Sequence, residues 1–202
     1  TDMLINPFKV FTDELRLLLL NPEAHTLFTR LTPTHGTSRL TDRECPEGQW
    51  IICGYGRFGK LVVDALSETG RPCTPIDPIL LNMSAKEIEG VWQDELDELR
   101  NAHLPYAAGI VVATGDDTRN LALVALARQI NPDIYVILRQ NDDHSAMLFQ
   151  ALQPDMLMVP SVMVARQCLA AMTSPMLPRL HEHFLTMPAE TVHRLLAYLP
   201  HQ

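Results

Sequence analysis

The sequence predicts an α/β fold: a doubly wound, six-stranded parallel sheet with an extra N-terminal helical segment. From Trp50 to about Pro175, short apolar runs alternate with helical patterns, which is typical of a parallel sheet with helices on both faces. Six strands within about 125 residues fit one complete doubly wound unit. We expect residues 1–48 to form a helix and a linker, 49–175 the sheet domain, and 176–202 a helical tail.

The expected elements follow one another in order. A buried strand at 50–53 leads into a helix that starts near Arg57 and stops at Gly70, because glycine commonly ends a helix. Further strands are expected at 72–77, 88–92, 107–114, 134–140 and 156–160, and further helices at 94–102, 118–130, 143–152 and 162–172. Before the sheet, 8–20 reads as an apolar helix and 32–48 as a polar, turn-rich linker. The helix at 162–172 is apolar nearly all round, so we expect it to contact something beyond its own sheet.

The composition indicates a globular protein with no general affinity for nucleic acid. The chain has 202 residues, 47% hydrophobic content and a formal charge of −8. Sequence-independent binding of nucleic-acid phosphates instead needs a basic surface. Its four cysteines are scattered and show no metal-binding spacing, so we expect reduced thiols, no metal site and a cytoplasmic location. No apolar run is long enough to span a bilayer. The chain begins and ends in mid-pattern, and we expect a piece of a larger protein.

The strongest chemical signal is the run Gly54-Tyr55-Gly56-Arg57-Phe58-Gly59. This GxGxxG pattern follows a predicted strand and opens a predicted helix, which is the context of a dinucleotide-binding, Rossmann-like loop. The first glycine permits a tight turn, the second lets a pyrophosphate approach the backbone, and the third lets helix and strand pack closely. Free N–H groups at the helix start then favour an anion. The alternative is a glycine-tight turn that binds no ligand.

An acidic residue stands where such a site needs one. Asp77 lies about 20 residues after the loop, at the end of the second strand, where a carboxylate accepts from ribose hydroxyls. It would repel a 2′-phosphate, which favours NAD or an adenine nucleotide over NADP. Otherwise Asp77 is an ordinary turn residue.

Further candidates lie at other strand ends. Thr114, Gly115 and Asp116 follow the fourth predicted strand, near the point where ligands bind in open sheets, although an aspartate there can equally cap the next helix. Arg57 opposes the helix dipole, which favours a phosphate contact over a solvated role. Arg139 ends the fifth strand, and is either a cation of the cleft or half of a structural ion pair.

These motifs together resemble one known family. The segments IICGYGRFG, VVATGDDTRNL, ILRQND and DMLMVPS, with Asp77, make the stretch from Trp50 to about Pro175 similar to the TrkA-N (RCK/KTN) module. That module is the NAD-binding regulatory domain of prokaryotic potassium channels and transporters. The resemblance implies Gly54, Gly56, Arg57 and Gly59 on the pyrophosphate and Asp77 on the ribose. It also implies Thr114, and less directly Asn120 and Arg139, in the cleft or the subunit contact.

The resemblance further implies what the protein does. It implies a non-enzymatic sensor of NAD(H), AMP, ADP or ATP that controls potassium transport or channel gating. The implied partners are a potassium channel or transporter subunit and a second copy in a homodimer or higher oligomer, at the inner face of the membrane if the protein is membrane-attached. The alternatives are a fragment of an NAD-dependent oxidoreductase, although 202 residues offer no evident substrate domain, and a methyltransferase, in which an acid usually stands at the position of Cys53.

The chain departs from the family in two places that concern the adenine half of the site. The Gly-Asp pair expected after the third strand is replaced by EGVWQDEL, where Gly90 or Asp94 would have to substitute. Pro72 and Pro75 interrupt the second strand, which is expected to be internal to the sheet and cannot spare ladder donors. The C-terminal ligand-binding subdomain of many relatives is not expected in residues 176–202.

The N-terminus resembles a later part of the chain. TDMLINP at 1–7 is echoed by PDMLMVP at 154–160 with a spacing of 153 residues, and Pro22 by Pro175. We therefore expect residues 1–48 to be the tail of an upstream repeat. The helix at 8–20 should then pack on the sheet or on the helix at 162–172 in a pseudo-symmetric way.

Overall fold

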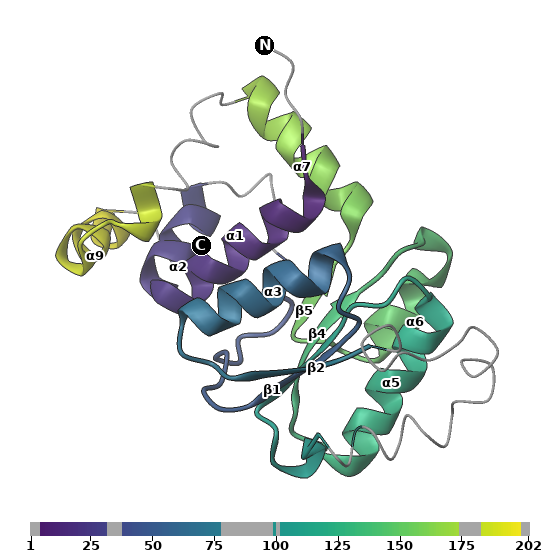
Figure 1. Ribbon diagram of the computed structural model, residues 1–202. Helices are drawn as coiled ribbons and strands as arrows, with labels where there is room; N and C mark the ends of the chain where they lie inside the picture. Colours follow the sequence, from purple (N-terminus) through teal and green to yellow (C-terminus); the bar gives the residue numbers. More distant parts are fainter. Residues whose placement is uncertain (1–4, 32–37, 78–98, 100–101, 174–182, 199–202) are drawn as a thin grey trace. The chain divides into compact units, whose positions relative to one another are not determined.

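A parallel sheet organises residues 39–159, which form one of the two compact units of the chain. The computed structural model describes residues 5–31, 38–77, 99, 102–173 and 183–198 (Figure 1). The other unit contains 1–38 and 160–202 and is helical in its described parts. The doubly wound Rossmann-like architecture predicted from the sequence is confirmed.

Five strands are described, all parallel and in the order β2-β1-β3-β4-β5. They are β1 (Trp50–Cys53), β2 (Cys73–Ile76), β3 (Gly109–Val112), β4 (Tyr135–Arg139) and β5 (Met156–Met158). Cys53 is level with Ile76 on one side and with Val112 on the other, so the carboxyl ends of these strands share one edge. The sixth strand, expected at 88–92, lies outside the described residues.

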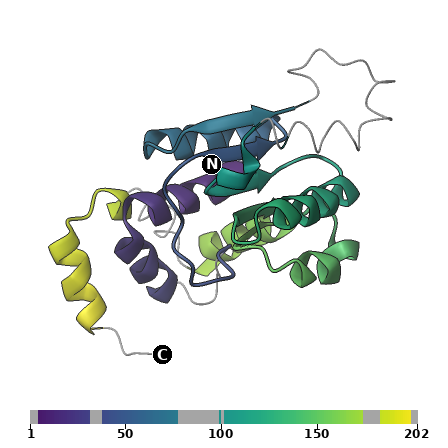
Figure 2. The same cartoon turned by 90° about the horizontal axis from the view of Figure 1, so that it is seen from below.

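Helices cover both faces of the sheet (Figure 2). α3 (Arg57–Glu68) joins β1 to β2, whereas α5 (Asp117–Ile130) and α6 (Ala146–Ala151) join β3 to β4 and β4 to β5. Two short 3₁₀ turns, η3 (Leu104–Tyr106) and η4 (Asp143–Ser145), precede β3 and α6. Because the chain winds one way from β1 to β2 and the other way from β3 to β5, the winding reverses between β1 and β3, which is where such sheets bind ligands.

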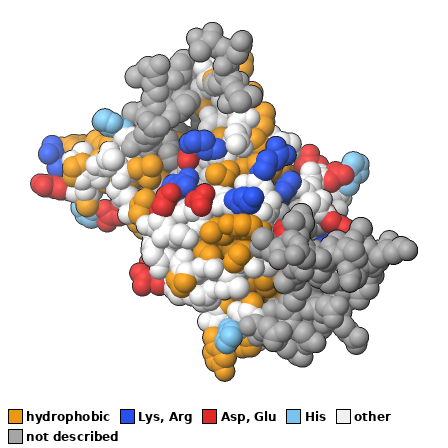
Figure 3. Space-filling view, in the orientation of Figure 1, with side chains coloured by type: hydrophobic (Ala, Val, Ile, Leu, Met, Phe, Trp, Pro, Cys, Tyr) orange, Lys and Arg blue, Asp and Glu red, His pale blue; other side chains and the backbone are white. Residues whose placement is uncertain are grey.

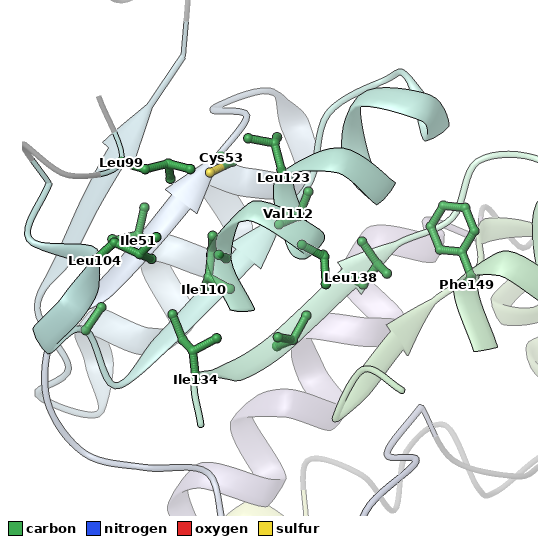
Figure 4. Close-up of a cluster of buried hydrophobic side chains, with 14 residues drawn as sticks. Ile51, Cys53, Leu99, Leu104, Ile110, Val112, Leu123, Ile134, Leu138 and Phe149 are labelled. Atoms are coloured by element: carbon green, nitrogen blue, oxygen red, sulfur yellow. The ribbon is translucent and has the colours of Figure 1, made fainter. Parts of the chain in front are cut away.

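The core follows the alternation of side chains along each strand. Ile51, Ile110 and Val136 point to the face covered by α5, where Leu123 and Val124 meet them, and α6 adds Phe149 (Figure 4). These side chains are almost entirely buried, and each contributes about 1.5–3 kcal/mol relative to an exposed position. On the opposite face, Ile52 lies beneath Gly59 of α3.

The hydrogen-bonding direction of the second strand explains Pro75, whereas Pro72 precedes the strand. The N–H of Trp50 donates to the Pro72 carbonyl and the N–H of Gly54 to the Ile76 carbonyl. Even-numbered residues of β2 therefore face β1, and the backbone nitrogen of Pro75 points away from it. Among the described strands β2 is an edge, where proline costs no ladder bond.

The segment before β1 is fastened to the amino edge of the sheet. Asp155, which is 1% exposed, accepts from Thr41 Oγ1 at 2.8 Å, from Arg43 Nη1 at 3.1 Å and from the Val136 N–H at 2.8 Å. The Pro46 carbonyl accepts from Arg71 Nε at 3.0 Å. Residues 39–49 thus belong structurally to the sheet unit.

The helical unit contains α1 (Pro7–Leu20), α2 (Pro22–Leu31), α7 (Pro160–Thr173) and α9 (Ala189–Tyr198). α1 packs on α2 and α7, and α2 packs on α9, so the predicted contact between the helices at 8–20 and 162–172 is confirmed. Its core contains Leu17, Ala24, Leu27, Phe184 and Val192. None of the described helices is both long enough and apolar enough to cross a membrane.

Figure 3 shows acidic, basic and hydrophobic side chains interspersed over the described part of one face.

Candidate functional site

The glycine loop joins β1 to α3, and two of its glycines are required by the fold. Gly54 has φ +99°, and a Cβ there would lie 2.9 Å from the carbonyl carbon of Ala113. A Cβ on Gly59 would collide with the carbonyl oxygen of Gly54. Both residues are needed for close packing of the loop against β3 and of α3 against β1.

Gly56 is different from its two neighbours in the motif. It is the residue before the first turn of α3, with φ −75°, a value open to any residue. It is exposed, and a Cβ built on it meets no atom within 4 Å among the described residues. Packing of the described chain therefore gives no reason for a glycine at this position.

Asp77 has a structural partner within the loop. Its Oδ2 accepts from the N–H of Tyr55 at 2.6 Å, and its side chain is largely buried, with the residue 9% exposed. The adjacent N–H of Gly54 donates to the Ile76 carbonyl at 2.9 Å. The carboxylate thus ties the end of β2 to the turn after β1, a role that the sequence did not indicate. The ribose contact stays a prediction.

The loop after β3 is held by a buried amide. Asn120, which is fully buried, accepts at Oδ1 from Thr114 Oγ1 at 2.6 Å and from the Thr114 N–H at 3.2 Å. Its Nδ2 donates to the carbonyls of Thr114 at 3.2 Å and Arg139 at 3.0 Å. Asp116 caps α5 by accepting from the Arg119 N–H at 3.2 Å, so the capping role that the sequence allowed is realised. Gly115 is exposed between them.

A second connection was not anticipated from the sequence. Asp117 accepts from the N–H groups of Asn141 at 2.8 Å and Asp142 at 2.9 Å, and from Asn141 Nδ2 at 2.7 Å. Together with Asn120 it joins the turn after β3 to the turn after β4. The sequence offered a weak signal only, an acid in the first turn of α5 and an Asn-Asp pair after the next strand.

Two arginines contribute positive charge to this edge of the sheet. Burial lowers the pKa of Arg139, Asp117 opposes that change, and the charge of Arg57 lowers the pKa further. The charges of Arg57 and Arg139 thus influence each other, although the two residues follow different strands. Lys60 adds a third cation above the ring of Tyr55, with its Nζ 5.5 Å from the ring centroid. Such an edge favours an anionic ligand.

The predicted residues thus come together in part. Gly54, Gly56, Gly59, Tyr55 and Asp77 form one connected turn, and Thr114 follows β3, the strand next to β1 in the sheet. Gly90 and Asp94, one of which was expected to substitute for the Gly-Asp pair, lie outside the described residues. In the described part of the chain no three His, Cys, Asp or Glu side chains gather as metal ligands would.

Residues 50–160, the strands and loops just described, match the family model of the TrkA-N domain. The chain belongs to the TrkA-N family. The match covers more than half of the 202 residues.

Curated relatives of this TrkA-N chain include potassium transport proteins. It is 32% identical over 107 residues to a Trk system potassium uptake protein TrkA homolog from Pyrococcus horikoshii, covering 50% of this chain and 46% of that protein. It is 26% identical over 99 residues to potassium channel protein 1 from Methanocaldococcus jannaschii, covering 45% of this chain and 29% of that protein. The chain therefore spans less than half the length of these relatives. Among solved structures, the GsuK channel bound to NAD is 21% identical, covers 71% of this chain and 25% of that one, and has a TM-score of 0.48.

Proposed function

We propose that the TrkA-N unit binds an adenine nucleotide, NAD(H) or AMP, ADP or ATP, and regulates a potassium channel or transporter without catalysing a reaction. The partner is the membrane subunit or domain of that potassium system, and the unit acts at the cytoplasmic face of the membrane. The names of the curated relatives support the potassium partner.

The observation that carries the nucleotide proposal is the environment of Gly56. The fold explains Gly54 and Gly59, but nothing in the described packing explains Gly56. A ligand that approaches the backbone at this point does explain it, because a side chain would occupy its place. The position is at the amino end of α3, where the helix dipole attracts phosphate.

The surrounding groups suit the other parts of a nucleotide. Arg57 and Arg139 supply positive charge for phosphates. In this proposal the carboxylate of Asp77, which also accepts from the Tyr55 N–H, accepts a ribose hydroxyl. Thr114, Gly115 and Asp116 follow β3 at the same carboxyl edge, and Phe58 is buried in the core.

The test is calorimetric titration of the chain with NADH, NAD⁺, ATP, ADP, AMP and S-adenosylmethionine. We expect an adenine nucleotide to bind, and to stabilise the fold by about 2.7 kcal/mol when present at 100 times its dissociation constant. Gly56→Ala should lose most of this binding and keep the unfolding midpoint, whereas Gly59→Ala should lower the midpoint. Arg57→Gln should weaken binding, and Arg30→Gln, an exposed arginine of α2, serves as its charge-matched control.

Three outcomes would overturn parts of the proposal. Binding of S-adenosylmethionine alone would indicate a methyltransferase. Turnover of NADH with carbonyl substrates would indicate an oxidoreductase. Unchanged nucleotide affinity in Gly56→Ala would remove the ligand explanation of that glycine. The transport role is tested separately, by nucleotide-dependent potassium flux through the intact assembly carrying wild-type or Gly56→Ala protein.

A further inference from the structure

The amino end of α3 carries two cations and no acid. A helix start favours an acidic side chain, because a negative charge complements the positive end of the helix dipole. α3 has no acid in its first turn, and its first and fourth residues are Arg57 and Lys60. Both cations oppose the dipole, so the helix itself gains nothing from their charge. An anion bound at this end would make the two charges favourable.

The side chain of Lys60 turns back toward the glycine loop. Its Nζ lies 5.5 Å from the ring centroid of Tyr55, the residue before Gly56. The backbone N–H of Lys60 donates to the Gly56 carbonyl at 3.0 Å. Residues four apart lie on the same face of a helix, with their side chains tilted toward its amino end. The ammonium of Lys60 therefore lies on the side of α3 that begins at Gly56.

Lys60 has a second possible partner that it does not contact. Asp64 is exposed four residues further along α3, a spacing at which opposite charges commonly pair on a helix. Within the described part of the chain, the contact of the Lys60 ammonium is with the ring of Tyr55 and not with this carboxylate. The charge is thus placed at the loop end of α3 and away from the middle of the helix.

Tyr55 is a fixed platform for this contact. Its N–H donates to Asp77 Oδ2 at 2.6 Å, and the N–H of the preceding Gly54 donates to the Ile76 carbonyl at 2.9 Å. The backbone that carries the ring is therefore tied to the end of β2. A cation above an aromatic ring at an exposed site is held only weakly, and Lys60 is exposed. The ring thus positions the ammonium and leaves it accessible to a ligand.

We propose that Lys60, positioned by Tyr55, is a specificity-determining residue that favours ADP and ATP over AMP. This inference rests on the proposed function, in which a phosphate meets the backbone at Gly56. The single phosphate of AMP is used in that contact, whereas ADP and ATP carry a further, terminal phosphate with its own negative charge. Lys60 offers this phosphate a cation one helical turn beyond Gly56. A lysine suits the role, because its ammonium is a compact charge on a flexible stem.

The test is calorimetric titration of wild type and variants with AMP, ADP, ATP and NADH. Lys60→Gln should lower the affinity for ADP and ATP about fivefold, the upper level for an exposed ion pair, and that for AMP less than about twofold. Lys60→Arg should keep the ratio of ATP to AMP affinity. Tyr55→Leu should lower this ratio about twofold, because the charge remains but loses its platform. Arg30→Gln, exposed on α2, is the charge-matched control and should leave the ratio unchanged.

Salt dependence separates a charge effect from a structural one. Raising the ionic strength should lower the ratio of ATP to AMP affinity in the wild type and change it less in Lys60→Gln, because salt screens exposed charges. An unchanged ratio in Lys60→Gln, or equal losses for all three mononucleotides, would overturn the role of Lys60 and leave the proposed function intact. Binding of NADH without any mononucleotide would do the same. Failure of the wild type to bind any of the four ligands would overturn both proposals.

Discussion

Replacing Asn120 by alanine should damage the carboxyl edge of the sheet more than any other single change in α5. The amide makes four hydrogen bonds, to the N–H, hydroxyl and carbonyl of Thr114 and to the carbonyl of Arg139. The Thr114 carbonyl keeps a second donor, Asn141 Nδ2 at 3.2 Å. Two backbone groups, the Thr114 N–H and the Arg139 carbonyl, lose the amide partner, and each costs about 1–3 kcal/mol when left unsatisfied.

We therefore expect Asn120→Ala to lower the free energy of unfolding by about 2–4 kcal/mol, which corresponds to a melting temperature about 10 °C lower for a unit of this size. Urea unfolding followed by circular dichroism measures the first quantity and calorimetry the second. Nucleotide affinity should fall as well, because the turn carrying Thr114 and Gly115 loses its anchor.

Asn131 provides the matched control for this prediction. It lies at the other end of α5, where its Nδ2 donates to the carbonyls of Leu104 at 3.2 Å and Ala107 at 3.0 Å. Asn131→Ala should cost stability of the same order but leave nucleotide affinity unchanged in the folded protein. If Asn120→Ala lowered the free energy of unfolding by less than about 0.5 kcal/mol, the level of an ordinary surface substitution, the cost assigned to the lost hydrogen bonds would be refuted. Equal losses of affinity in both variants would refute the local anchoring of the site.

Three further outcomes are expected. Gly54→Ala, at φ +99° and against the Ala113 carbonyl, should lower the free energy of unfolding by about 1–3 kcal/mol, as measured by urea denaturation. Thiol labelling at pH 8 should modify exposed Cys168 long before Cys45, because burial raises the pKa of the Cys45 thiol to about 12 and leaves almost no thiolate. Nuclear magnetic resonance should find the pKa of His144 raised by its hydrogen bond to Asp142, and Asp142→Asn should return it towards 6.5. The stabilising hydrogen bond between protonated His144 and Asp142 is then fully present below pH 6.5 and is lost as the pH rises through the folded-state pKa of His144. Equal His144 pKa values in the wild type and in Asp142→Asn would contradict this prediction.

The fold was predictable because its main signals are local. Strands β1, β3 and β4 are continuous apolar runs, as buried parallel strands are, and the glycines of the first turn sit between a strand and a helix. That Pro75 leaves the hydrogen bonds between β1 and β2 intact was not predictable, for a non-local reason. Whether a strand nitrogen faces a neighbour depends on the register of β2 against β1, and no pattern within the strand itself specifies that register.

The site was predictable to the extent that it consists of backbone turns. Gly54 and Gly59 are recognisable because their conformation and packing admit no side chain. The contacts of Asp77 with Tyr55 and of Asp117 with Asn141 were not recognisable, since each joins residues more than 20 positions apart through geometry created by the sheet. The same holds for Asp155, whose partners Thr41 and Arg43 lie over 100 residues away.

Whether a contact of the proposed site is shared by all candidate nucleotides decides whether that contact can distinguish one nucleotide from another. In the proposed nucleotide site, the Gly56 backbone, the start of α3 and nearby arginines form the phosphate half, and every candidate nucleotide offers a phosphate and a ribose to it. Contacts shared by all candidates cannot discriminate among them, because specificity is a difference between affinities. Gly56→Ala should then weaken each nucleotide that binds by a similar factor and preserve their ranking. Discrimination between NAD(H) and the mononucleotides must come from groups beyond the loop, and we expect the turns after β3 and β4, which Asn120 and Asp117 hold together, to supply it.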